Sequence, residues 1–373
     1  MNVIVLGGAG DMGSRAVEDL AATPDVTAVT IADRNKEEAR RIAASLAESR
    51  ARIEVAAVDA TDHSALVKAM RGHDVAASAL GPFHRFEAPL VRAAIDAGVD
   101  YVSVCDEWEA VEAVIAESDA AARSAGRIIV TGLGASPGIT NVGVRYLADR
   151  MDRLRKAEIY CYQPLDAGGG PAVIQHMLFI MSGNVEIRRG GRQVRIPALA
   201  EERRVDFPRF GEIQLWNMGH SEPFTIPMSF PDVEEVGFFM GFGKGSGWLV
   251  NPARWGWFST PSAVDRGARF VSWLEGLSPT DEPGWGALRI DAWGDSGGAP
   301  VHRSLCGIGQ MRDATGLALS VGTLLVGRKQ LSVTEGGVYA PEACIPPEPF
   351  ISAMSEKGIG SYEDLEMTRP IEF

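Results

Sequence analysis

Cysteine is scarce in this chain, and its arrangement excludes the small disulfide-rich and zinc-ribbon folds. The 373 residues include four cysteines, and no two of them form a CxxC pair. Neither a zinc site nor a disulfide framework is therefore indicated. Scattered free thiols are typical of a reducing compartment, so we expect a cytoplasmic protein without a bound metal.

Long apolar runs and basic clusters are missing as well. The most lipid-like stretch, residues 237–258, is interrupted by Lys244, Pro252 and Arg254. It cannot form the apolar helix of about 20 residues that a bilayer requires. The formal net charge is -13, and an acidic surface repels nucleic acid and anionic lipid. We therefore expect a small-molecule partner, with neither nucleic acid nor membrane.

What is present is a regular alternation of two periodicities at the start of the chain. Short apolar runs, typical of buried parallel strands, occur at residues 3–6, 28–32, 53–58, 75–79, 101–104 and 128–131. Helical patterns separate them at residues 12–22, 36–47, 64–70, 88–97 and 109–125. This order predicts an α/β fold with a doubly wound parallel Rossmann sheet.

The pattern changes after residue 132. Turns, short strand-like runs and Trp-rich loops continue to about residue 310, which predicts an inserted α+β domain. An apolar helix follows at 314–326, and an amphipathic one at about 349–357. The expected organisation is residues 1–135 for the dinucleotide-binding domain, 136–310 for the inserted domain and 311–373 for the C-terminal helices.

The strongest motif is the glycine loop that directly follows the first strand. Gly8, Gly10 and Gly13 have the GxGxxG spacing. In this motif the first glycine permits a tight turn, the second lets the backbone approach a pyrophosphate, and the third allows close packing of helix on strand. The helix N-terminus adds N–H groups and partial positive charge for the phosphates.

An acidic residue follows at the distance expected for ribose recognition. Asp33 ends the second strand, 20 residues after Gly13. A carboxylate there repels a 2′-phosphate, which favours NAD, whereas Arg34 could pair with one and leaves NADP open. Asp59 and Ala60, after the third strand, are expected near the adenine; the alternative for Asp59 is a helix N-cap.

Two further strand ends should border the reacting part of the cofactor, because ligands of such sheets bind at the carboxyl ends of the strands. One is the segment 79–84, which ends in His84; the other is 104–107. We interpret His84 as the acid/base or orienting group, because histidine titrates near neutral pH. Asp106 and Glu107 could bind a substrate ammonium or accept a proton, and their alternative is capping of the next helix.

Several segments together resemble the saccharopine dehydrogenase/reductase-like oxidoreductases, and within them the L-lysine 6-dehydrogenases. They are VLGGAGDMG (5–13), GPF (81–83), AAIDAGVDYVSV (93–104), GLGASPGITN (132–141) and GGVYAPEACIPPEPF (336–350). The resemblance implies a C-terminal segment that returns to the Rossmann domain, dimerisation through the inserted domain and hydride transfer at a C–N bond of an amino acid or amine. Asp11 departs from the family, which usually has an apolar or aromatic residue beside the pyrophosphate.

Motif and resemblance give the expected site residues. Those expected to line NAD(P) are Gly8, Ala9, Gly10, Asp11, Met12, Gly13, Asp33, Arg34, Asp59, Ala60, Leu80, Gly81, Pro82, Phe83 and Cys105. Those expected at the substrate are Phe83, His84, His176, His220 and Lys244, in a pocket between the loops 81–84 and 104–107 and the inserted domain. Cys105 is also readable as packing, and His176, His220 and Lys244 as structural or solvated.

Two other functions fit the same sequence. One is a protein that binds NAD(P) as a sensor without catalysis, and the other is an enzyme that uses NAD transiently, as in polyamine-type chemistry. Turnover of the nicotinamide cofactor with an amine distinguishes the dehydrogenase from both.

Overall fold

The computed structural model describes residues 1–164, 170–243, 246–258, 260–277 and 284–373. The chain forms two compact units, one of Met1–Ile139 with Arg312–Lys357 and one of Thr140–Met311 with Gly358–Phe373. The expected return of the whole segment 311–373 to the first domain is therefore wrong for its last part. Tyr362 exchanges two backbone hydrogen bonds of 2.8 Å with Cys306, which ties that tail to the second unit.

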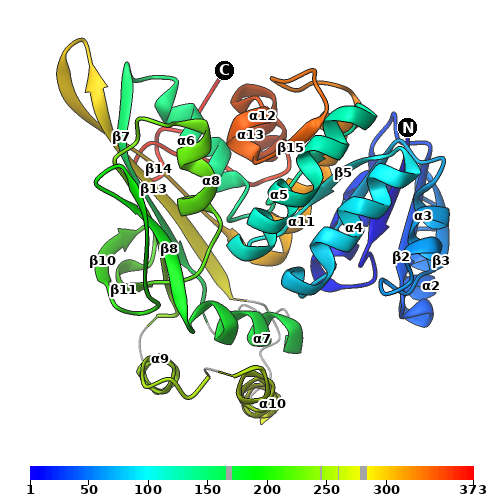
Figure 1. The fold of residues 1–373 in the computed structure, drawn as a ribbon, viewed down its shortest axis with the longest axis horizontal. Coiled ribbons are helices and arrows are strands. Elements are labelled where there is room, and N and C mark those ends of the chain that lie inside the picture. The colour runs from blue at the N-terminus through cyan, green and yellow to red at the C-terminus, as the bar shows by residue number, and fades with distance from the viewer. Residues whose placement is uncertain (165–169, 244–245, 259, 278–283) are drawn as a thin grey trace. The chain divides into compact units, whose positions relative to one another are not determined.

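The first unit contains a seven-stranded, wholly parallel sheet (Figure 1). Its strands, in spatial order, are β15 (Gly337–Tyr339), β6 (Ile128–Val130), β5 (Asp100–Ser103), β4 (Val75–Ser78), β1 (Asn2–Leu6), β2 (Ala28–Asp33) and β3 (Arg52–Ala57). The six predicted strands and the α/β fold class are confirmed. The seventh, β15, was missed because its sequence, Gly337-Val338-Tyr339, is not an apolar run like the other six.

Helices cover both faces of this sheet, as a doubly wound fold requires. They are α1 (Asp11–Ala22), α2 (Lys36–Ser45), α3 (His63–Met70), α4 (Phe83–Ala97), α5 (Trp108–Ala125), α11 (Met311–Gly327), α12 (Pro341–Cys344) and α13 (Pro347–Glu356). The helices α3, α4 and α5 pack in a row, and Leu66, Leu90 and Val114 join the strands in one core. The helix α11 packs closely on α1, since a Cβ at Gly316 would lie 2.6 Å from the Arg15 side chain.

One helix differs from its prediction in a way that bears on function. The pattern placed the start of α4 at residue 88, but the helix begins at Phe83, and Pro89 lies inside it. The extra turn is stabilised by a contact distant in sequence: the backbone N–H groups of Phe83 and His84 donate to the Glu107 carboxylate, at 3.3 and 2.6 Å. Periodicity cannot detect such a cap.

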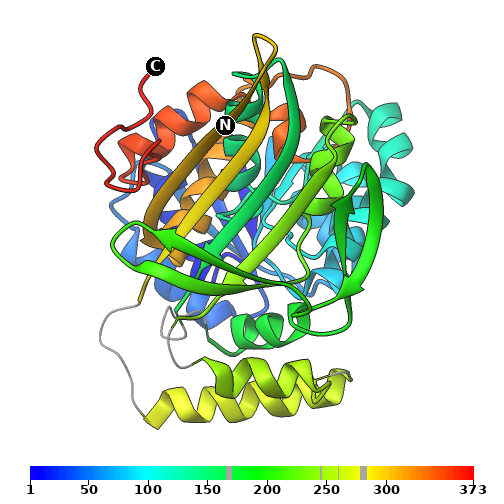
Figure 2. The same ribbon diagram turned by 90° about the vertical axis from the view of Figure 1, so that its left-hand side faces the viewer.

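The second unit is built on an eight-stranded mixed sheet (Figure 2). Its strands are β7 (Arg153–Tyr162), β8 (Asn184–Arg189), β9 (Arg192–Pro197), β10 (Glu202–Phe207), β11 (Gly211–Asn217), β12 (Glu235–Gly241), β13 (Trp285–Ser296) and β14 (Ala299–Gln310). The pair β12–β7 is parallel, whereas the other pairs are antiparallel. The α+β character predicted for this part is confirmed.

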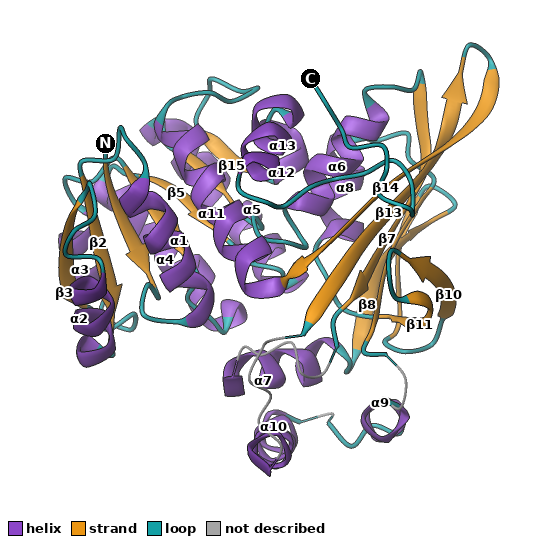
Figure 3. Cartoon of the chain, turned by 180° about the vertical axis from the view of Figure 1, so that it is seen from behind, coloured by secondary structure: helices purple, strands orange, loops and turns teal. Residues whose placement is uncertain are grey.

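The helices of the second unit, drawn purple in Figure 3, are α6 (Ile139–Ala148), α7 (Gly170–Ile180), α8 (Glu222–Ser229), α9 (Gly247–Arg254) and α10 (Pro261–Leu277). The helix α8 packs on β8 and β12, and α10 packs on α7. None of the helices in the described part of the chain combines the length and the apolar character that a membrane crossing needs.

Candidate functional site: a glycine loop and a histidine–carboxylate pair

The glycine loop has the geometry of a phosphate cradle. Gly13 is confined, because a Cβ there would lie 2.2 Å from the Gly7 carbonyl oxygen, and Gly8 is confined by Val5. A Cβ at Gly10 would meet only the Gly7 carbonyl oxygen, at 3.3 Å. The outer side of the loop is thus open at the N-terminus of α1, where a pyrophosphate fits.

The residue that makes the tight turn is Gly7, not Gly8 as the motif suggested. Gly7 has φ of +72°, a conformation that favours glycine. Its N–H donates to the Ala32 carbonyl at 2.9 Å, and its own carbonyl accepts from Gly10. The doubled glycine, Gly7-Gly8, was the signal available in the sequence.

Asp11 stands in the first turn of α1, where its negative charge competes with a bound phosphate. The Arg312 guanidinium lies 3.1 Å from the Asp11 carboxylate and 3.0 Å from Glu18. It also donates to the Ser14 hydroxyl at 3.2 Å. Arg312 therefore offsets the negative charge of Asp11. No sequence pattern could predict this pair, because 301 residues separate Arg312 from Asp11.

Asp11 and Arg312 should have opposite effects on cofactor binding. Exchange D11N is expected to raise NAD(P)H affinity about two- to fivefold, and R312A to lower it by a similar factor, because half-exposed charges near a helix N-terminus contribute about 0.3–1 kcal/mol. Fluorescence titration of NADH and NADPH measures both. The cofactor affinity of the double variant should lie close to that of the wild type. A loss of affinity in D11N as well as in R312A, with the two losses adding in the double variant, would contradict this explanation.

Asp33 lies at the end of β2, as expected for a ribose-binding acid. One carboxylate oxygen accepts from the Ala9 N–H of the glycine loop at 3.2 Å, and the other accepts from the Asn35 N–H at 2.8 Å. Each oxygen retains a second lone pair for a ribose hydroxyl. The next residue, Arg34, is exposed, so it is accessible to a 2′-phosphate.

Asp59 and Ala60 follow β3, at the same carboxyl-terminal edge of the parallel sheet as Asp33. The Asp59 carboxylate accepts from the Thr61 N–H at 2.9 Å and from the Thr61 hydroxyl at 2.7 Å, and these bonds lower the pKa of Asp59. The alternative of a helix N-cap at Asp59 is wrong, because Asp62 caps α3 through the Ala65 N–H.

His84 and Glu107 are brought together at the ends of β4 and β5. The imidazole Nδ1 lies 2.8 Å from the Glu107 carboxylate. The carboxyl group is 2% exposed, whereas the imidazole is 50% exposed. A carboxylate that accepts from Nδ1–H fixes the tautomer of the neutral ring and leaves Nε2 as its basic nitrogen. The pair is an oriented acid/base group whose ring is reachable from solvent.

The other residues of the 104–107 segment differ in accessibility. Cys105 is fully buried, and burial raises the pKa of its thiol well above its usual value. A packing role fits this environment. Asp106 is half-buried, and its charge acts on the buried Glu87 of α4. Leu80 and Phe83 are half-buried, and Gly81 and Pro82 are exposed.

The second unit contains a second, enclosed histidine–carboxylate pair. His220 Nδ1 lies 2.5 Å from Glu222 Oε2, and both side chains are buried. The His220 ring stacks on Phe238, with centroids 3.8 Å apart, and Thr140 donates to Glu222 at 3.0 Å. This geometry is that of a structural core network. His176 lies on α7, and Lys244 lies outside the described residues.

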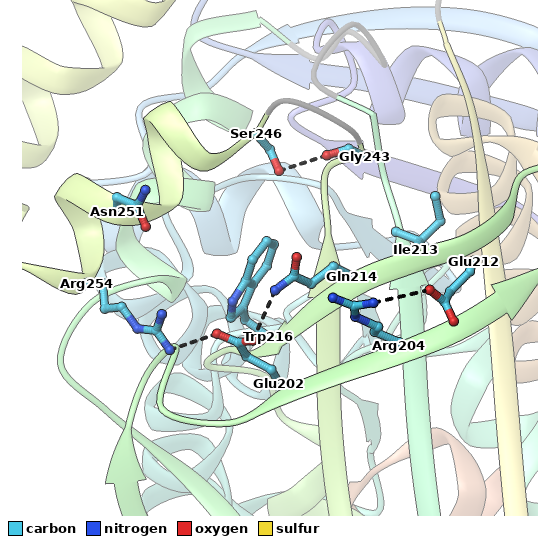
Figure 4. Close-up of a pocket in the computed structure, with 10 residues that line it drawn as sticks. All are labelled: Glu202, Arg204, Glu212, Ile213, Gln214, Trp216, Gly243, Ser246, Asn251 and Arg254. Atoms are coloured by element: carbon cyan, nitrogen blue, oxygen red, sulfur yellow. Dashed lines mark hydrogen bonds and ion pairs between the residues drawn. The ribbon is translucent and has the colours of Figure 1, made fainter.

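A separate cavity of about 420 Å³ opens between the β10–β11 hairpin and α9 (Figure 4). Its charged groups are paired with one another: Arg254 with Glu202 at 2.9 Å and Arg204 with Glu212 at 3.7 Å. Gln214 also donates to Glu202 at 3.0 Å. A charged ligand would have to displace these partners. No group of three or more metal-ligating side chains occurs within the described ranges.

Comparisons with known proteins agree with this geometry. Residues 3–130 match the model of the saccharopine dehydrogenase NADP binding domain. Carboxyaminopropylagmatine dehydrogenase from Synechocystis sp. is 25% identical over 263 residues, 65% of this chain and 63% of the relative, so the match spans less than two thirds of that protein. The fold resembles saccharopine dehydrogenase (L-Glu forming) from Saccharomyces cerevisiae, with a TM-score of 0.70, 16% identity and coverage of 96% and 98%.

The glycine loop and parallel sheet define a Rossmann-type domain that uses NAD(P) as its cofactor. More particularly, residues 3–130 are similar to the NADP binding domain of saccharopine dehydrogenases, and the chain shares the fold of a saccharopine dehydrogenase. Membership of the whole chain in the saccharopine dehydrogenase-like family, and the likeness to lysine 6-dehydrogenases within it, stay predictions.

Proposed function

We propose that this protein is an NAD(P)-dependent dehydrogenase that transfers a hydride at a C–N bond of an amino acid or related amine. The observation that carries the proposal is the His84–Glu107 pair at the strand ends that border the nicotinamide in Rossmann folds. The curated relative is named as the dehydrogenase of an aminopropyl compound, which supports an amine substrate.

In the proposed reaction the hydride and the proton go to different groups. Oxidation of an amine removes a hydride from carbon and a proton from nitrogen, and the nicotinamide supplies the hydride acceptor when it is bound. His84 takes the proton on Nε2, while Glu107 holds the ring and stabilises the imidazolium that forms. In the reverse direction the imidazolium returns the proton.

Asp33 should select the cofactor. We expect NADH to bind more tightly than NADPH by about tenfold, because a carboxylate near the 2′-position repels a phosphate. Exchange D33N removes the negative charge but keeps an oxygen for the Ala9 N–H, so it should reduce the difference in affinity between NADH and NADPH. Exchange R34A should lower the affinity for NADPH and leave that for NADH unchanged. Titration of both cofactors measures this; equal NADPH affinity of wild type and D33N would contradict it.

The activity is tested by a screen of amino acids and polyamines with NAD and NADP, and of oxo acid–amine pairs with the reduced cofactors. The expected result is a steady change in nicotinamide absorbance with at least one amine. Tight cofactor binding without turnover would favour a sensor instead. Return of the absorbance to its starting value while product accumulates would favour transient use of NAD.

A further inference from the structure

A fully buried glutamate lies one helical turn from His84. Glu87 is on α4 and is 0% exposed. Its carboxyl group accepts from the Tyr101 hydroxyl at 3.0 Å and from the Ser103 hydroxyl. Both partners are on β5 and are also fully buried. A carboxyl group that is fully buried is costly to ionise. The presence of Glu87 at this position, with two hydrogen bonds, therefore points to a specific role.

The hydrogen bonds of Glu87 extend to both strand ends that carry the site. On one side, the Ser78 hydroxyl of β4 bonds to the Tyr101 phenol and accepts from the Leu80 N–H at 3.4 Å. On the other side, Ser103 accepts from the Cys105 N–H at 3.5 Å. Glu87 is thus the centre of a network that reaches Leu80 in the segment 79–84 and Cys105 in the segment 104–107.

The charged neighbours of Glu87 are other acids. Besides the two hydroxyls, the groups that act on its titration are the carboxylates of Glu107 and Asp106, and both raise its pKa. The Cys105 thiol is a further titratable neighbour. Burial is the largest cause, and the pKa of Glu87 rises from 4.5 to about 7. The group therefore changes charge within the working range of most enzymes.

We propose that Glu87 is a positioning residue for the His84–Glu107 pair, and that its protonation state tunes the pair. When protonated, Glu87 is a neutral link between the ends of β4 and β5. When ionised, it adds a third negative charge to Asp106 and Glu107 and stabilises the imidazolium form of His84. The proposal rests on the proposed function only in taking His84 as the proton-transfer group.

The same group makes stability depend on pH in a defined direction. The folded protein keeps the Glu87 proton up to about pH 7, whereas the unfolded chain releases it near 4.5. The native state therefore binds more protons between these values, so this contribution to stability falls as pH rises from 4.5 through 7 and is constant above. Glutamine at this position removes that slope.

The test compares wild type with E87Q, and with E112Q, an exposed glutamate of α5, as the matched control. Infrared difference spectra between pH 6 and pH 8.5 should show loss of the carbonyl stretch of a protonated carboxyl group in wild type and E112Q but not in E87Q. Melting curves across the same range should have a shallower pH dependence in E87Q alone. With the substrate found by the screen, the pH–rate profile of wild type should have an inflection near pH 7 that E87Q lacks.

Two results would overturn the proposal: no protonated carboxyl band in wild type at pH 6, or identical pH–rate profiles in wild type and E87Q. If E87Q does not fold, the infrared titration of wild type alone decides whether Glu87 is protonated at pH 6. E87M, which removes the charge and both acceptors, then replaces E87Q in the comparison of pH–rate profiles. The infrared and melting measurements need no substrate. A positive band without turnover would therefore count against the proposed function and not against the titration of Glu87.

Discussion

Exchange of His84 for asparagine is expected to lower kcat/KM by about 100-fold, because a positioned acid/base group contributes roughly 10²–10⁴ to rate. Asparagine can still hydrogen-bond to Glu107 but cannot carry the proton. Exchange E107Q should cost a similar factor, since it leaves the imidazole without a carboxylate partner. Initial rates with the substrate identified by the screen give both values.

The double variant H84N/E107Q should be no slower than the slower single variant, because residues that act as a unit are not additive. The matched control is H63N. His63 forms another imidazole–carboxylate pair in the same unit, 2.9 Å from Asp96, and is 52% exposed. Its exchange should leave the rate unchanged. Equal losses in H63N and H84N, or multiplicative losses in the double variant, would show that the pair has no shared chemical role.

Exchange G13A should abolish cofactor binding and destabilise the first unit by about 3 kcal/mol, because overpacked sites cost 1–3 kcal/mol or more. The added Cβ would lie 2.2 Å from the Gly7 carbonyl oxygen and 3.0 Å from the Gly8 Cα, which are backbone atoms that cannot rotate away. The melting temperature should fall by roughly 6–12 °C. Differential scanning fluorimetry and cofactor titration measure the two effects.

The matched variant is G10A, in the same loop. Its Cβ would meet only one atom, at 3.3 Å, and Gly10 has φ of -77°, which alanine adopts without strain. Stability should therefore change by less than about 0.5 kcal/mol. Cofactor affinity should nevertheless fall by about tenfold, or 1.4 kcal/mol, because the methyl group occupies the path of the pyrophosphate. Normal affinity in G10A would place the phosphates elsewhere.

Much of this fold is determined locally, and the sequence was sufficient for it. Five of the six apolar runs of the first unit are buried strands, because a parallel sheet covered on both faces needs uninterrupted apolar segments. The sixth forms β3, an edge strand whose residues are exposed or half-buried. The glycine spacing located the cradle because the constraint is steric and falls on consecutive residues. The same reasoning placed His84 and Glu107 separately at two strand ends, since the carboxyl ends of neighbouring parallel strands share one edge.

The second unit was predicted less completely, and the reason is its topology. Strand-like runs were recognisable in the sequence only at residues 157–162, 194–196 and 288–293, which lie in β7, β9 and β13. The strands β8, β10, β11, β12 and β14 were not assigned, because mixed sheets pair segments far apart in sequence and alternate burial irregularly. The pair β7–β12, for example, joins Ala157 to Val236.

What the sequence alone determined is the class of fold, the cofactor loop and the two residues of the candidate acid/base pair. Tertiary structure decided how these residues act. It set the first turn of α4 on the Glu107 carboxylate, brought Arg312 to Asp11, and enclosed Glu87 among hydroxyls and acids. Each of these is a contact between segments distant in the chain, and its electrostatic consequence depends on burial. Local periodicity specifies neither.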